Sequence, residues 1–195
     1  MKRCFTLLLA LLLALSTLLF AVSCGEEVPA DGSDGGNGQA VQGTPLDLGF
    51  CTTMLPDGMM KMSSGNGTTI YINTSTGSSL IITERTGPAS VNVDGSIDYS
   101  SFDESFSEAE LRNAFSQQVR NYEMLDFTYA VLAPHRLYEL TLKTRSLSEP
   151  DRVLYASVYV ALSSPDTDNN ISTTTLIFNG AESQDVAKVV CPTLK

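Results

Sequence analysis

The segment that most constrains the fold lies near the C-terminus, at residues 152–162, and is largely apolar on both faces. In an extended chain, alternate side chains point to opposite sides. From residue 154 on, one side is apolar: Leu154, Ala156, Val158, Val160 and Leu162. The other side is half apolar as well, with Val153, Tyr155, Tyr159 and Ala161. A strand that buries both faces belongs inside a sheet with a layer packed on each side.

Other segments have the alternation or composition of strands: residues 48–55, 59–63, 68–73, 79–84, 127–133, 137–144 and 172–178. A hairpin turn is predicted at Gly65-Asn66-Gly67, and the polar residues 86–105 are predicted to form a loop. Short connections favour antiparallel neighbours. We therefore expect one mainly antiparallel sheet.

Two helices are predicted to cover this sheet. The first begins at Ser107, an N-cap that forms a capping box with Glu110. Its apolar stripe recurs every three or four positions: Leu111, Phe115, Val119 and Tyr122. The second spans residues 181–191, and its valines face inward: Val186, Val189 and Val190. The expected fold class is α+β, an antiparallel β-sheet covered by helices.

The order of these elements resembles the PsbP-like superfamily. The first strand ends in Leu55-Pro56-Asp57-Gly58, and a mid-chain helix, long antiparallel strands and a short terminal helix follow. That group includes photosystem II extrinsic subunits, bacterial DcrB-like lipoproteins and a Ran-binding nuclear-import factor. The resemblance covers residues 46–195 and implies an α/β/α sandwich. It also implies a binding or assembly factor, since the group has no shared catalytic residues.

One residue departs from the family pattern. The family more often has a bulky aromatic after the glycine of that turn, where this chain has Met59. The alternative fold is a cystatin-like or NTF2-like α+β sheet. Those folds usually place a long helix before the sheet, and the sequence shows none.

The N-terminus has the parts of an export signal. Lys2 and Arg3 precede an apolar run over residues 5–22, and small residues precede Cys24. This resembles the lipobox of bacterial lipoproteins, although the family usually has Leu where this chain has Ala21. The resemblance implies a signal peptide over residues 1–23, palmitate-type lipid on Cys24, and a lipid anchor at the extracytoplasmic face of the cell membrane. The alternative is an uncleaved membrane-spanning helix.

Residues 24–45 are dense in Gly and Asp and contain almost no large apolar side chain. Such a segment buries too little surface to offset its chain entropy, which predicts a disordered tether. The remaining residues, 46–195, suit a single α+β domain.

The charge balance bears on the partners. The chain has 12 Lys and Arg against 22 Asp and Glu, a formal net charge of −10, and the signal removes two of the cations. Nucleic acids and anionic lipid surfaces both need basic patches. The expected partners are therefore the membrane, through the N-terminal lipid, and an unidentified protein or envelope component, with no nucleic acid.

Cys51 and Cys191 are the cysteines left after the signal and the lipid site are assigned. An even pair in an exported protein is a disulfide candidate. The alternative is two buried free thiols.

Catalytic and metal-binding constellations are hard to find. His135 is the single histidine, at a bend, and no Gly-x-Ser-x-Gly elbow accompanies it. Residues 166–170 resemble the opening of a calcium loop, but Ile171 and Ile177 occupy the positions of its Gly and Glu. No Cys and His cluster suits zinc. We therefore predict no enzyme, catalytic residue, metal or cofactor.

Two functions remain open. The first is a non-catalytic binding or assembly module of the cell envelope. The second is a small-ligand receptor whose pocket is lined by tyrosines: Tyr129, Tyr138, Tyr155 and Tyr159. A pocket of several hundred Å³ favours the receptor, whereas an exposed apolar patch without a cavity favours the module.

Overall fold

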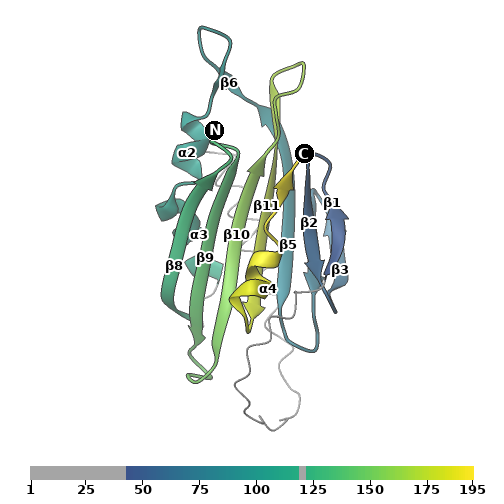
Figure 1. Cartoon of the computed structure of the whole chain (residues 1–195), viewed down its shortest axis with the longest axis vertical. Helices are drawn as coiled ribbons and strands as arrows, with labels where there is room; N and C mark the ends of the chain where they lie inside the picture. Colours follow the sequence, from purple (N-terminus) through teal and green to yellow (C-terminus); the bar gives the residue numbers. More distant parts are fainter. Residues whose placement is uncertain (1–42, 119–121) are drawn as a thin grey trace.

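A computed structural model describes residues 43–118 and 122–195. Its elements along the chain are β1 (Gly43–Asp47), β2 (Cys51–Pro56), β3 (Met60–Gly65), β4 (Thr68–Ile72), β5 (Ser79–Pro88), β6 (Ser90–Val91), β7 (Ile97–Asp98), α2 (Ser100–Ser105), α3 (Glu108–Gln118), β8 (Tyr122–Leu132), β9 (Leu137–Ser146), β10 (Val153–Leu162), β11 (Asn170–Ala181), α4 (Gln184–Val189) and β12 (Thr193–Leu194) (Figure 1).

A seven-stranded antiparallel sheet organises the molecule, in the order β3-β4-β5-β11-β10-β9-β8. The doubly apolar segment forms β10, which pairs with β9 on one side and β11 on the other. Its residues from Ala156 to Leu162 are all buried. The prediction of an inner strand covered on both faces is therefore confirmed, and so is the α+β class.

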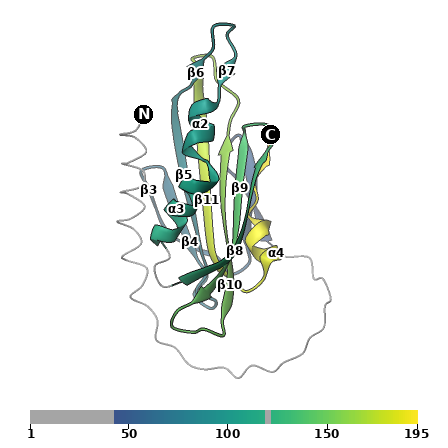
Figure 2. The ribbon, with the colours of Figure 1, turned by 90° about the vertical axis from the view of Figure 1, so that its left-hand side faces the viewer.

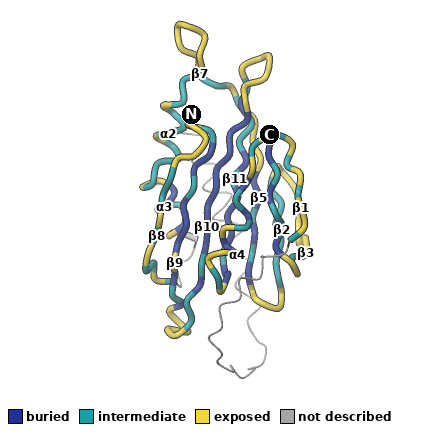
Figure 3. The backbone as a smooth tube through the Cα atoms, viewed as in Figure 1, coloured by how far each residue is buried: buried dark blue, intermediate teal, exposed yellow. Residues whose placement is uncertain are grey.

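Each face of the sheet has its own core, and Figure 2 shows the covering layers edge-on. On one face, α2 and α3 lie over the sheet, and Leu111 and Phe115 of α3 pack against β9 and β10. On the other face, α4 packs together with a small three-stranded sheet ordered β1-β2-β12. In Figure 3 the strands between these layers are the most buried part of the fold.

The predicted loop at residues 86–105 contains regular structure. Strand β5 continues to Pro88, the β6–β7 hairpin follows, and α2 ends the segment. The N-cap of α2, Tyr99, makes no side-chain cap hydrogen bond. Because this helix lacks the usual start signal, sequence reasoning missed it.

The helix predictions are confirmed in position and corrected in extent. Leu111 donates its N–H to Ser107 O at the start of α3, as a helix beginning there requires. Tyr122 belongs to β8 and not to the helix stripe, and Val119 lies outside the described residues. The closing helix is shorter than predicted because β11 continues to Ala181 and Ser183 then caps α4.

Several predictions concern the N-terminus. The signal peptide, Cys24 and most of the tether lie outside the described residues. Residues 43–45, directly before the predicted start of the domain at residue 46, pair with β2 as part of β1. Within the described parts of the chain, no helix is long and apolar enough to cross a membrane.

The β3–β4 turn gives a first testable prediction. Gly67 has a φ of +71°, and a Cβ there would lie 2.6 Å from Glu84 O. Gly67→Ala is therefore expected to lower the free energy of unfolding by about 2 kcal/mol, because alanine is disfavoured in the left-handed backbone conformation. The clash of its Cβ with Glu84 O should lower the free energy of unfolding further. Gly65→Ala is the matched control, because no atom lies within 4 Å of its added Cβ. Urea unfolding of both variants measures the difference, and equal effects would contradict the reasoning.

Candidate functional site

In the structure Cys51 and Cys191 are free thiols, the alternative to a disulfide that the sequence left open. The C-terminus does return to the first strands, but Leu194 of β12, not Cys191, is the residue paired with Cys51. Burial raises the pKa of each thiol to about 11. A thiol with a raised pKa is a poor nucleophile.

This environment predicts slow thiol chemistry. At pH 8, a pKa about two units above the ordinary value leaves about 100-fold less thiolate, and burial restricts access further. We expect iodoacetamide to label Cys51 and Cys191 at least about 100-fold faster in urea than in the native protein. Peptide mass spectrometry measures both rates. A linked Cys51–Cys191 peptide from non-reduced protein would contradict the structure.

His135 is less isolated than its place at a turn suggests. Its Nδ1 lies 2.8 Å from the Asp103 carboxylate, and its ring stacks on Tyr99 with centroids 5.8 Å apart. Asp103 also accepts a 2.8 Å hydrogen bond from the hydroxyl of Tyr138. The Tyr138 side chain is fully buried. Burial, followed by the adjacent Asp103 carboxylate, raises the pKa of Tyr138 well above its usual range.

This network joins α2 to the turn between β8 and β9, where Ala133 and His135 both have positive φ. Such backbone strain persists where surrounding contacts hold it. In the described residues, no serine or cysteine side chain hydrogen-bonds to His135. The geometry thus indicates a structural role: the network holds α2 against the turn between β8 and β9. The sequence places His135 at a bend but does not reveal this contact, because Asp103 lies 32 positions away along the chain.

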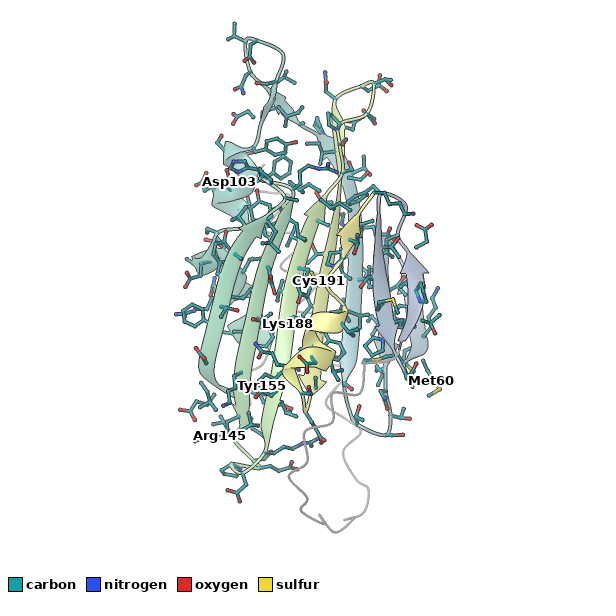
Figure 4. All side chains as sticks on the ribbon, in the orientation of Figure 1. Met60, Asp103, Arg145, Tyr155, Lys188 and Cys191 are labelled. Atoms are coloured by element: carbon teal, nitrogen blue, oxygen red, sulfur yellow. The ribbon has the colours of Figure 1, made fainter. Side chains whose placement is uncertain are left out.

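An open hollow of about 210 Å³ lies on the α4 side of the sheet. Side chains from four elements surround it: Asp126, Thr128, Thr141, Lys143, Tyr155 and Gln184. Thr128 and Thr141 hydrogen-bond to each other across β8 and β9. Figure 4 places Tyr155 beside α4 and Lys188. The hollow is smaller than the roughly 300–1,000 Å³ of typical ligand pockets.

The four tyrosines suggested for a receptor pocket do not converge. Tyr129 and Tyr138 belong to the core under α2 and α3, whereas Tyr155 and Tyr159 belong to the core under α4. The sheet separates the two pairs. Tyr138 and Tyr159 are also fully buried, so their rings are packing elements.

The calcium-like loop is a hydrogen-bonded turn. Asp166 accepts hydrogen bonds from the N–H groups of Asp168 and Asn170 and from the Asn170 amide. These bonds lower the pKa of Asp166. Across the described ranges, no group of three or more His, Cys, Asp or Glu side chains is arranged to hold a metal ion.

The most exposed apolar surface within the sheet lies along its β3 edge. All six residues of β3 are exposed, and β3 is the last strand on its side of the sheet. Met60 and Met62 are 52% and 58% exposed. Figure 4 shows Met60 at the margin of the molecule opposite Arg145. Sequence reasoning found the strand, but not its edge position, which depends on long-range pairing between β5 and β11.

No protein-family model matches the chain, and no curated protein matches its sequence. Solved structures with a similar fold include cyanobacterial PsbP (CyanoP) from Synechocystis sp. PCC 6803, at 14% identity and a TM-score of 0.42, over 84% of this chain and 98% of that one. LpqN, involved in cell envelope biogenesis of Mycobacterium tuberculosis, is 14% identical with a TM-score of 0.41, over 79% and 91% of the two chains.

The Ran-binding protein Mog1p of Saccharomyces cerevisiae is 12% identical with a TM-score of 0.39, over 70% of this chain and 77% of that one. Likeness at this level assigns no residue of a site in this chain.

Proposed function

We propose that this chain is a non-catalytic binding or assembly module of the cell envelope, held at the extracytoplasmic face of the membrane by lipid on Cys24. The lipobox-like sequence before Cys24 supports the anchor. Two or three acyl chains give stable membrane attachment, whereas one gives only marginal attachment. In this proposal the folded domain binds a polypeptide partner.

The observation that carries the proposal is the exposed β3 edge. An edge strand presents unpaired N–H and C=O groups that can pair with another chain, and most proteins protect such edges. Here the edge also carries Met60 and Met62, whose flexible side chains adapt to varied partners. Strand addition to a sheet edge is an established mode of polypeptide recognition.

The small-ligand receptor has less support. The hollow beside α4 is open and small, and the tyrosines lie on opposite faces of the sheet. Specific ligand pockets are instead concave, largely apolar and enclose most of the ligand. A module that binds a polypeptide partner therefore accounts better for the exposed β3 edge than a small-ligand receptor does.

Crosslinking in the native membrane tests the proposal, with Cys24→Ala as the unanchored comparison. We expect the wild-type protein to fractionate with membranes, to carry an acylated Cys24 by intact-mass measurement, and to yield a discrete crosslinked polypeptide product. Cys24→Ala should leave the membrane fraction and lose that product. An unacylated Cys24, or no crosslinked polypeptide in either form, would overturn the proposal.

A further inference from the structure

Charge distinguishes the β3 edge from the rest of the molecule. In a chain of net charge −10, residues 58–83 contain no Asp or Glu and one charged side chain, Lys61. This is the longest stretch without acidic residues in the described parts of the chain. It includes β3 and β4 completely, so the sheet ends on this side in a nearly uncharged surface.

The opposite edge of the sheet is different. Strand β8 carries Glu123 and Asp126 beside its register shift, which lies between Met124 and Asp126. If two copies paired through β8, four carboxylates would meet along one edge. Like charges directly opposite each other destabilise a strand pair. The edge at β8 is therefore protected against self-pairing, whereas the edge at β3 lacks carboxylates.

We propose that the β3 edge pairs with β3 of a second copy of this chain, in an antiparallel, two-fold symmetric contact. This inference rests on the proposed function, because it names the polypeptide that the edge binds. Two copies of an acidic protein repel each other unless they meet where acidic side chains are missing. The β3 edge offers such a surface together with unpaired backbone groups.

The strand sequence suits a two-fold register centred on Ser63, because directly opposed residues of a symmetric antiparallel pair must lie on the same face of the sheet. In that register Lys61 faces Gly65 of the second copy, and Met62 faces Ser64. The two lysines then lie about four residues apart along the edge, or about 13 Å, which exceeds the Debye length of about 8 Å at physiological salt. No pair of like charges is brought into direct contact.

The contact is expected to be weak in solution and stronger on a membrane. A six-residue strand is small beside a standard interface, which buries about 800 Å² per partner, and the register shift between Lys61 and Ser63 shortens its regular part. Anchoring two copies to one membrane raises their effective concentration and so favours a weak contact.

Site-specific photo-crosslinking of the full-length protein in its native membrane tests this inference. A benzoylphenylalanine replaces Ser64 in one strain and Val131, an exposed residue of the β8 edge, in another. We expect the Ser64 probe to give a product of twice the protein mass that contains only this chain, and the Val131 probe to give at least about tenfold less. Mass spectrometry of the product identifies the crosslinked residues, which should lie in β3 of the second copy.

Charge reversal on the edge provides a second measurement. Adding Met60→Asp and Met62→Asp to the Ser64 probe places four carboxylates in the contact and should lower the yield about tenfold. Val131→Asp is the matched control and should leave the yield unchanged, and circular dichroism checks that all variants fold.

The remaining outcomes distinguish the two proposals. A Ser64 product containing a different protein would overturn the second-copy inference while supporting the proposed function. No product at Ser64, with the crosslinked polypeptide of the native membrane still present, would also overturn this inference and leave the proposed function standing. An unchanged yield in the charge-reversed variant would contradict edge pairing.

Discussion

Replacing Phe178 by alanine is expected to lower the free energy of unfolding by about 3–5 kcal/mol, the usual cost of removing a large aromatic side chain from a core. Phe178 is fully buried on β11, the middle strand of the sheet, and belongs to the core beneath α4. Its neighbours are held in place by strands on both sides, so the space left by the ring cannot collapse fully.

Chemical denaturation of the Phe178→Ala chain measures this effect, and Met60→Ala is the control. Because Met60 is 52% exposed, its truncation should change the free energy of unfolding by less than about 0.5 kcal/mol. Phe115→Ala, on the opposite face under α3, should cost an amount similar to Phe178→Ala. A cost below about 1 kcal/mol at Phe178 would mean that the core beneath α4 is not closely packed.

Alkaline pH is expected to destabilise the fold, starting near pH 9. The pKa of the Cys51 thiol rises from 9.0 to about 11 on folding, mainly because burial disfavours the thiolate. Between these values the unfolded chain loses its proton while the folded chain keeps it. The stability that Cys51 contributes is therefore complete below pH 9 and is lost progressively as the pH rises, by about 2 kcal/mol at pH 11.

Two tyrosines extend this effect to higher pH. Burial raises the pKa of both Tyr138 and Tyr159, so each resists ionisation in the folded state. Urea unfolding at a series of pH values from 8 to 11 measures the total loss in the free energy of unfolding. Cys51→Ala should reduce the slope between pH 9 and 11, whatever its effect at pH 8. A stability independent of pH over this range would contradict the burial of these groups.

The sequence predicted the parts of the fold that depend on local pattern. The doubly apolar segment at residues 152–162 became an inner strand, and the capping signal at Ser107 marked the start of α3. Both predictions succeeded because strand alternation and helix capping depend on residues that are close together in the sequence.

Features that depend on distant contacts were not predictable in the same way. Helix α2 lacks a side-chain cap and is docked by the contact between Asp103 and His135 across the fold. The four tyrosines looked alike in sequence, but strand register sends them to opposite faces. The position of β3 at the sheet edge likewise follows from pairing between β5 and β11. These strands are far apart in the sequence, so no local pattern predicts their pairing.

Hydrogen exchange of the β3 backbone, measured on the anchored protein in membrane vesicles and on the monomer in detergent, tests the central claim most directly. If the β3 edge binds a polypeptide, peptides covering residues 59–66 should exchange at least about tenfold more slowly in the vesicles, while peptides from the β8 edge exchange at the same rate in both. Equal exchange at residues 59–66 in vesicles and in detergent would mean that this edge stays unpaired in the membrane and would contradict the claim.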